Sequence, residues 1–466
     1  MPPRTEHAKV RMQDRPNHHA PADPSRYTGP GGCENQLEKA GSAAIYSLMD
    51  INVLVLGDGI GGIVTANLLR KQAQRKNLSI RLKLVGNSPV HTYQPGLLFL
   101  PFQRPGYREL SDVQKETARF IAPGIEYVRE TIMAIDTDRR TVTTDRQTLD
   151  YDWLVLALGC RTLVDAIEGL PEQWGRTAHG FYTPDSAMRL ARALEDFRGG
   201  DLLIDVAETP IKCPVAPLEF ACLADEYLTQ RGLREKTRIT LVTPLNGAFT
   251  KPVCNEVLTH ILVDKDIQVV SNTYLSSVAR NSIRCPDGKE LDFDLMVVIP
   301  PHEGSDLIED AELGDGLGFG HTNKQTLKSS VAERVFLVGD NAGIPGSKAG
   351  SVAHFQADAV VHNILREIAG KEAEPCADGH TNCFIETGHG KAVLIDFNHE
   401  IQPVPGKFPM PFVGPLSLLK ETRLNHLGKL AFKHIYWNML LPARPLPLVG
   451  SRMSMVGKKL HLLNEI

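Results

Sequence analysis

The stretch Ile51-Asn-Val-Leu-Val-Leu-Gly-Asp-Gly-Ile-Gly-Gly62 decides the fold of this chain. Its unbroken apolar run is typical of a strand buried in a parallel sheet, and a helical pattern follows the glycines over residues 63–71. This order of strand, GxGxxG and helix is the dinucleotide-binding fingerprint. In it, Gly57 and Gly59 permit a tight turn close to the phosphates, and Gly62 lets the helix pack on the strand. The sequence therefore predicts an α/β fold that begins with a nucleotide-binding Rossmann-like unit.

The next strand of this unit, over residues 80–85, ends at Gly86 and Asn87. An acidic residue usually binds the ribose at this point of the fingerprint. We expect Asn87, or a backbone group, to make that contact instead.

Two later stretches resemble the strands that complete the FAD domain in flavoproteins with two dinucleotide-binding domains. One runs over residues 149–159 and ends at Gly159, and the other ends at Gly339-Asp340. The resemblance implies that Asp340 binds the ribityl chain and that Lys348 lies beside the flavin, where a cation stabilises the anionic reduced ring. We therefore expect an FAD domain over residues 49–165 and 320–370, a second Rossmann-like domain over 166–319, and a C-terminal domain over 371–466.

The second domain departs from the usual pattern in the stretch Thr209-Pro-Ile-Lys-Cys-Pro-Val-Ala-Pro-Leu-Glu219. A second glycine-rich turn normally stands here, because a backbone that approaches a pyrophosphate closely needs glycine. This loop has no glycine, three prolines and Cys213. Such a loop cannot hold NAD(P)H phosphates in the usual way, but it can hold a thiol rigidly. Our interpretation is that sulfur chemistry at Cys213 has replaced nicotinamide binding.

The chain has eight cysteines and no CxxC pair, so no metal site is predicted. A cysteine is by default a small buried hydrophobe, and Cys160 is assigned such a packing role. Cys383 differs, because it stands in a polar stretch bracketed by glycines, residues 378–388. We interpret this stretch as a loop that presents a reactive thiol.

Together with the FAD motifs, three segments resemble those of sulfide:quinone oxidoreductases. They are Lys212-Cys-Pro-Val-Ala-Pro217, Asn382-Cys383 with Leu394-Ile-Asp-Phe397, and Tyr436-Trp-Asn438. This family is related to flavocytochrome c sulfide dehydrogenase and type II NADH dehydrogenase, and the resemblance extends over about residues 50–445. It implies two Rossmann-like domains of the FAD/NAD(P)-linked reductase type. It also implies non-covalent FAD, because residues 91–103 lack the cysteine that binds flavin covalently in some members.

The resemblance further implies that Cys213 and Cys383 are the redox pair beside the flavin and that Glu219 lies near flavin and quinone. Hydrosulfide would attack a disulfide or sulfur chain between the cysteines, with Cys383 as the freed thiolate. Glu219 would carry protons, the alternative being a carboxylate that only stabilises a helix start. A sulfur acceptor would then remove the product.

The C-terminal residues 408–441 mix aliphatic, aromatic and cationic side chains, including Lys429 and Lys433. This mixture favours an amphipathic region that lies in a membrane interface and reaches a membrane quinone. The alternatives are a helix docked on the core or a dimer contact. Removal of residues 409–466 is then expected to free the protein from membranes and leave FAD bound.

Composition restricts the remaining possibilities. A net charge of −4 gives no reason to expect nucleic acid, and no run approaches the roughly 18 apolar residues of a membrane span. Residues 1–48 are predicted to be a disordered extension without the apolar segment of a secretory signal. We therefore expect a peripheral membrane protein and leave a homo-oligomer open. The rival functions are a type II NADH:quinone oxidoreductase, a sulfide dehydrogenase with a cytochrome acceptor, and a non-catalytic flavin-binding module.

Overall fold

The computed structural model describes residues 51–410, 414–446 and 448–460. The predicted extension over residues 1–48 lies outside the described residues. Two parallel sheets and a third, mixed sheet form the described part, as the prediction of an α/β fold required.

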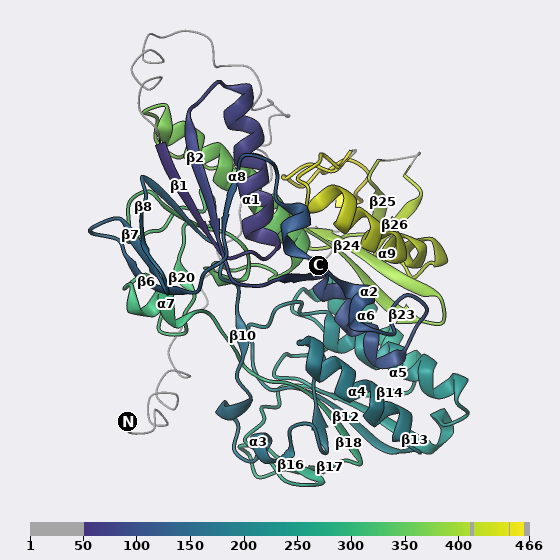
Figure 1. Cartoon of the computed structure of the whole chain (residues 1–466). Coiled ribbons are helices and arrows are strands. Elements are labelled where there is room, and N and C mark those ends of the chain that lie inside the picture. The colour runs from purple at the N-terminus through teal and green to yellow at the C-terminus, as the bar shows by residue number, and fades with distance from the viewer. Residues whose placement is uncertain (1–50, 411–413, 447, 461–466) are drawn as a thin grey trace. The chain divides into compact units, whose positions relative to one another are not determined.

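The first sheet is parallel and has the strand order β21-β9-β1-β2-β5. Its strands are β1 (Ile51–Leu56), β2 (Ile80–Val85), β5 (Glu126–Val128), β9 (Trp153–Leu156) and β21 (Val335–Leu337). Helices α1 (Ile60–Arg75) and α8 (Gly350–Ile368) are far apart in the sequence but lie side by side against this sheet (Figure 1). The carboxyl ends of β1, β9 and β21 therefore meet at one edge, where open α/β sheets bind ligands.

Both faces of the central strand β1 are covered, which explains its unbroken apolar run. Val53 and Val55 pack in the cluster that contains residues of α1 and α8. Leu54 and Leu56 pack on the other face. That face is covered by a small antiparallel sheet and by a short helix, namely β6 (Ile132–Asp136), β7 (Thr141–Thr144), β8 (Thr148–Asp150) and α7 (Asp306–Asp310).

The second sheet is also parallel, with the order β11-β18-β12-β13-β14. Its strands are β11 (Ala178–His179), β12 (Gly200–Val206), β13 (Thr237–Val242), β14 (Ile267–Val270) and β18 (Leu295–Ile299). Its helices are α4 (Pro184–Asp196), α5 (Ala216–Gln230) and α6 (Pro252–Asp264). The glycine-free loop that carries Cys213 joins β12 to α5, at the carboxyl edge of this sheet.

The C-terminal part is a four-stranded sheet of order β23-β24-β26-β25 with a helix packed on it. Its elements are β23 (Thr381–Gly388), β24 (Lys391–Phe397), β25 (Gly406–Phe408), β26 (Leu416–Leu418) and α9 (Arg423–Ile435), which continues into the π-helical turn η10 (Tyr436–Leu440). The prediction of a loop around Cys383 is wrong, because Cys383 lies in β23 and pairs with Ile395 of β24. Because the residues before Cys383 are polar, the sequence pattern did not indicate a strand there.

Shorter elements connect these parts. They are β3 (Val90–Thr92), α2 (Leu110–Val113), β4 (Gln114–Glu116), β10 (Arg161–Thr162), α3 (Leu170–Gln173), β15 (Ser277–Val278), β16 (Ser282–Arg284), β17 (Glu290–Asp292), β19 (His302–Glu303), β20 (Gly320–His321) and β22 (Ala342–Gly343). Short 3-10 turns lie at Gln94–Leu98, Leu100–Phe102, Thr117–Phe120, Val164–Ala166, Arg234–Lys236 and Gly339–Asn341.

One apolar cluster runs through all three sheets, with Val55, Ile204 and Ile395 as members from each. The predicted domain boundaries at residues 165, 320 and 370 stay predictions. Within the described ranges, every helix is too short or too polar to cross a lipid bilayer.

Candidate active site

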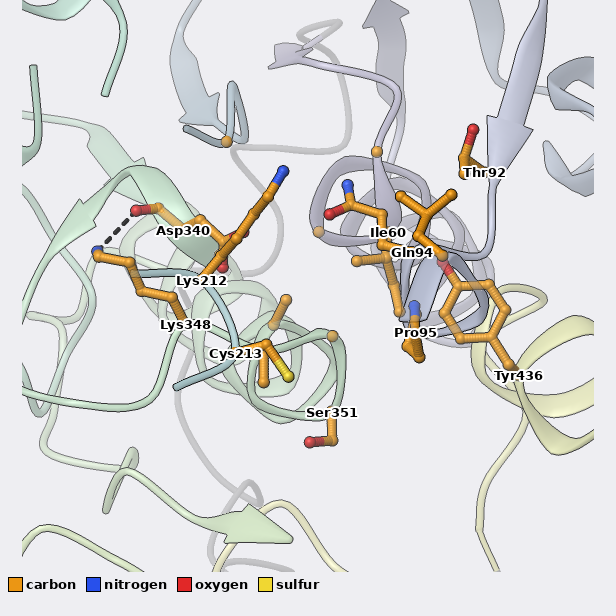
Figure 2. A pocket seen from close by; sticks show the side chains of 18 of the residues that line it. Ile60, Thr92, Gln94, Pro95, Lys212, Cys213, Asp340, Lys348, Ser351 and Tyr436 are labelled. Carbon is orange, nitrogen blue, oxygen red and sulfur yellow. Dashed lines mark hydrogen bonds between the residues drawn. The ribbon is translucent and has the colours of Figure 1, made fainter. Parts of the chain in front are cut away.

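A cavity of about 330 Å³ lies among the three sheets. Eight of the predicted site residues line it, namely Gly59, Gly159, Cys213, Glu219, Gly339, Asp340, Lys348 and Cys383. Gly57, Gly62 and Asn87 are not in its wall. Figure 2 shows Lys212, Cys213, Asp340 and Lys348 on one side of the cavity and Gln94, Pro95 and Tyr436 on the other.

Two glycines of the first turn are closely packed against backbone atoms, and the third has open space beside it. Gly57 has a φ of +104°, and a Cβ there would lie 2.3 Å from the carbonyl oxygen of Ala157. A Cβ on Gly62 would lie 1.8 Å from the oxygen of Gly57. A Cβ on Gly59 would meet nothing within 4 Å, so this backbone is open to the cavity. Gly57 and Gly62 therefore fix the turn, while Gly59 leaves room for a ligand beside the start of α1.

Asn87 is exposed and is not in the cavity wall, and its amide donates a hydrogen bond to Thr131 Oγ1 at 3.2 Å. Asp58, within the glycine turn, lines the cavity at this place. Its carboxylate accepts hydrogen bonds from Ser88 N at 2.9 Å and from the Tyr127 hydroxyl at 2.8 Å. An acidic side chain therefore lies beside the end of β2, although the sequence after β2 has Asn87. A contact of Asn87 with a ribose stays a prediction.

Asp340 and Lys348 form the part of the wall that follows β21. The Lys348 ammonium donates to the backbone oxygens of Asp340 at 2.7 Å, drawn in Figure 2, and of Ala342 at 3.1 Å. Burial lowers the pKa of Lys348 and raises the pKa of the Asp340 carboxyl. Lys212 and Lys348 are joined by a backbone bridge, and both residues line the cavity at this edge.

Cys213 and Cys383, far apart in the sequence, meet at the cavity. Both residues line its wall. The interaction between the two thiols lowers the pKa of the Cys383 thiol, as does the nearby Lys429 ammonium, and the same interaction together with burial raises the pKa of the Cys213 thiol. Cys383 is therefore the thiol that ionises first.

The backbone of Cys213 is held in an unusual conformation. Its φ of 84° lies in the left-handed region that residues with a side chain rarely adopt. Its carbonyl oxygen accepts hydrogen bonds from Ala216 N at 2.8 Å and from the Tyr182 hydroxyl at 3.4 Å. These bonds tie the residue to the first turn of α5, and the side chain lines the cavity.

Glu219 lies in the first turn of α5 and is 1% exposed. It is paired with Lys429, a cation that we expected at a membrane interface. Its Oε1 accepts hydrogen bonds from Lys429 Nζ at 2.7 Å and from Glu386 N at 2.8 Å. Lys429 had been grouped with cations of a membrane interface, but it is 7% exposed and also donates to the carbonyl of Phe384 at 2.8 Å. Lys429 stands three residues after His426 and four before Lys433. This spacing did not indicate that its face of α9 packs against the core.

Aromatic residues line the far end of the cavity. His91 Nε2 lies 2.7 Å from the Tyr436 hydroxyl, and burial lowers the pKa of His91 to about 4. His91 is therefore neutral at physiological pH. Phe432 of α9 lines the cavity beside Tyr436, so this end of the wall is mainly apolar and aromatic.

Other cysteines contribute less to the cavity. Cys160 is not in its wall, and burial raises the pKa of its thiol to about 12, so the thiol is protonated at neutral pH. Cys222 and Cys254 are fully buried in the apolar cluster.

A family model described as pyridine nucleotide-disulphide oxidoreductase matches residues 51–357 of this chain. A mouse protein named mitochondrial sulfide:quinone oxidoreductase is 26% identical over 406 residues, which cover 84% of this chain and 86% of the mouse protein. A type II NADH:quinone oxidoreductase of Staphylococcus aureus is 24% identical over 389 residues, which cover 76% of this chain and 91% of that protein.

The fold is similar to that in the crystal structure of the sulfide:quinone oxidoreductase from the hyperthermophilic bacterium Aquifex aeolicus. The TM-score is 0.71 at 22% identity, and the match covers 84% of this chain and 92% of the Aquifex chain. At this identity the likeness shows a shared fold.

Proposed function

The chain belongs to the pyridine nucleotide-disulphide oxidoreductase family, and from this premise we propose that it is a sulfide:quinone oxidoreductase that works through Cys213 and Cys383. The observation that carries the proposal is that Cys213 and Cys383, far apart in the sequence, line the same cavity as the glycine turn. The relatives named for sulfide:quinone oxidation support it, because they cover most of the chain.

FAD, the cofactor of this family, fits the residues that line the cavity. The open backbone at Gly59 and the start of α1 suit the pyrophosphate, since a helix N-terminus binds anions. Gly159 and Gly339 have positive φ values and leave space, and Asp340 is the candidate for the ribityl chain. Lys348 supplies the cation for the flavin. Bound non-covalently, FAD would supply the acceptor for two electrons on their way to the quinone.

The chain's own residues account for the sulfur chemistry. In the resting enzyme a sulfur bridge joins Cys213 and Cys383. Hydrosulfide attacks the sulfur on Cys213, which forms a persulfide there, and the bond to Cys383 breaks with its electron pair. The lowered pKa of Cys383 makes it the better leaving group. Lys429 stabilises the resulting thiolate, and a sulfur acceptor later removes the sulfur from Cys213.

Contact with a membrane quinone is proposed for the face of α9 that points away from the core. Leu424, Leu427 and Leu430 are 43%, 57% and 40% exposed, and Lys420 and Arg423 are exposed beside them. Exposed leucines next to cations suit the boundary between headgroups and acyl chains. The opposite face of α9 carries Lys429 and Phe432 to the cavity, so one helix joins the proposed membrane surface to the site.

The test is an anaerobic titration of the holoprotein with sulfide, followed by decylubiquinone, with flavin absorbance as the readout. Sulfide should bleach the flavin and the quinone should restore it. Cys213→Ala and Cys383→Ala should slow bleaching by about three orders of magnitude or more, since removal of a nucleophile has effects of that size. Cys376→Ala serves as the matched control, because Cys376 is half-buried and lies outside the cavity wall.

Three results would contradict the proposal. Bleaching by NADH but not by sulfide would indicate a type II NADH:quinone oxidoreductase. A reduced flavin that is not reoxidised by quinone but is reoxidised by a co-purified haem subunit would indicate a cytochrome acceptor. Unchanged bleaching in both cysteine variants would leave a flavin protein without thiol chemistry.

A further inference from the structure

A second pair, between a carboxylate and a histidine, lies next to the Glu219–Lys429 pair. The two carboxylate oxygens of Glu386 lie 2.8 and 3.0 Å from Nδ1 of His426. Glu386 is fully buried, whereas the His426 side chain is 16% exposed. Glu386 N is also the group that donates to Glu219, so the inner and outer pairs share a residue.

The two pairs come from three elements, because Glu219 lies in α5, Glu386 lies in β23, and both nitrogen partners lie in α9. Phe384 and Glu386 stand two apart on β23, and His426 and Lys429 stand three apart on α9, so each set lies on one face. Lys429 acts electrostatically on Glu386, lowering its pKa, while burial as the larger cause raises it. The side chains of Glu219, Lys429, Glu386 and His426 therefore form a continuous line. This line begins with Glu219 and Lys429 in the cavity wall and ends with His426 at the surface.

Other charges face this line from neighbouring segments. Arg104 lies 3.9 Å from the Glu386 carboxylate and also pairs with Glu226 of α5. Glu219 acts on Glu386 from α5 and raises its pKa. Carboxylates thus alternate with the side-chain nitrogens of Lys429 and His426 along the line, so that each buried carboxylate has a partner that can compensate its charge.

The stoichiometry of the proposed reaction requires that protons from solvent reach the site. Oxidation of hydrosulfide by two electrons yields one sulfur atom and one proton. Reduction of a quinone to a quinol consumes two electrons and two protons. Each turnover on hydrosulfide must therefore take one proton from solvent, while Glu219 is almost completely buried.

We propose that Glu386 and His426 form the entry by which this solvent proton reaches Glu219 and the quinone. His426 takes up the proton at the surface, Glu386 receives it, and the Glu219–Lys429 pair passes it to the cavity. The proposal rests on the proposed function, with Glu219 as proton carrier, and adds a route and two proton-transfer residues to it.

The experiment separates the two halves of the reaction in His426→Ala holoenzyme. Flavin bleaching by sulfide should keep its wild-type rate, because that half needs no proton from solvent. Reoxidation by decylubiquinone should become about 100-fold slower, the usual effect of losing a general acid. Added imidazole should restore part of that rate, which a merely structural role of His426 would not allow.

Two further variants complete the test. His434→Ala is the matched control, because His434 is exposed on the same helix and bonds only within the last turn, to Asn438. It should leave both rates unchanged. Glu386→Gln keeps the shape of the side chain, and it should slow reoxidation without rescue by imidazole.

Equal slowing of both half-reactions in His426→Ala, or a slow reoxidation that imidazole does not improve, would overturn the proton route. Failure of the proposed function gives a different result, since wild-type flavin would then not be bleached by sulfide at all.

Discussion

Asp205 is a buried carboxyl that the proposed reaction does not use. It lies in β12, at the centre of the second sheet, with an exposed fraction of 0%. Neither of its side-chain oxygens has a hydrogen-bond partner among the described residues. Burial raises the pKa of Asp205 from 3.8 to about 8, so the native protein holds a proton there at neutral pH.

This proton makes stability depend on pH in a defined direction. Between about pH 4 and pH 8 the unfolded chain has released the proton and the native state has kept it, so stability falls as pH rises. The loss should be on the order of 5 kcal/mol across this window, and Asp205→Asn should remove it. The measurement is urea unfolding of wild type and variant at pH 5 and pH 8.

The control is Asp201→Asn, at the exposed start of the same strand, where Asp201 pairs with Arg238. It should keep the wild-type fall in stability between the two pH values. If Asp205→Asn shows the same fall in stability between pH 5 and pH 8, Asp205 is not the group that titrates.

At the scale of elements, α9 has two faces with separate tasks. The inner face pairs Lys429 with Glu219, and the outer face exposes Leu424 and Leu427. The double variant Leu424→Asp/Leu427→Asp should weaken binding to anionic phospholipid vesicles by at least about tenfold for each leucine, given about 1.5–3 kcal/mol for burying such a side chain. FAD content and bleaching by sulfide should not change. Vesicle sedimentation measures the binding.

Val263→Asp is the comparison variant, because Val263 is 65% exposed on α6. It should bind vesicles as the wild type does. Unchanged binding of the leucine double variant would exclude α9 as the membrane contact.

The sequence predicted those elements whose local pattern is strong. The glycine turn at Gly57 and Gly59 follows a buried strand, so pattern and geometry agree. The strand of Cys383 was predicted as a loop, because its first residues are polar and its pairing with β24 is a tertiary feature. Lys429 was expected at a membrane interface for a related reason, since only the buried carboxylate of Glu219, 210 residues away, explains an inward-facing lysine.

At the scale of the whole molecule, buried ion pairs join the described residues after 408 to the rest of the chain. Lys429 pairs with Glu219 of α5, and Lys458 pairs with Asp396, which also bonds His380 at 2.8 Å. This argues against the expectation that residues 409–466 can be removed while FAD stays bound. Their removal leaves Glu219 and Asp396 buried without an ammonium partner.

A chain that ends at residue 408 should therefore lose FAD and cooperative unfolding, because breaking one buried ion pair costs about 3–5 kcal/mol. Thermal unfolding and flavin fluorescence after gel filtration measure both losses. A chain that ends at residue 460 keeps the described contacts and should match wild type. Full FAD retention in the shorter chain would instead mean that the C-terminal part is separable.

The place of β21 in the first sheet bears on how the protein is made. A ribosome delivers β1, β2 and β9 early, but β21 and Asp340 emerge only after the whole second sheet, and β23 with Cys383 emerges later still. During synthesis Cys213 has neither its thiol neighbour nor a finished flavin pocket. Under the proposed function, electron transfer through Cys213 and Cys383 therefore begins only when translation is nearly complete, and unfinished chains carry no oxidising centre.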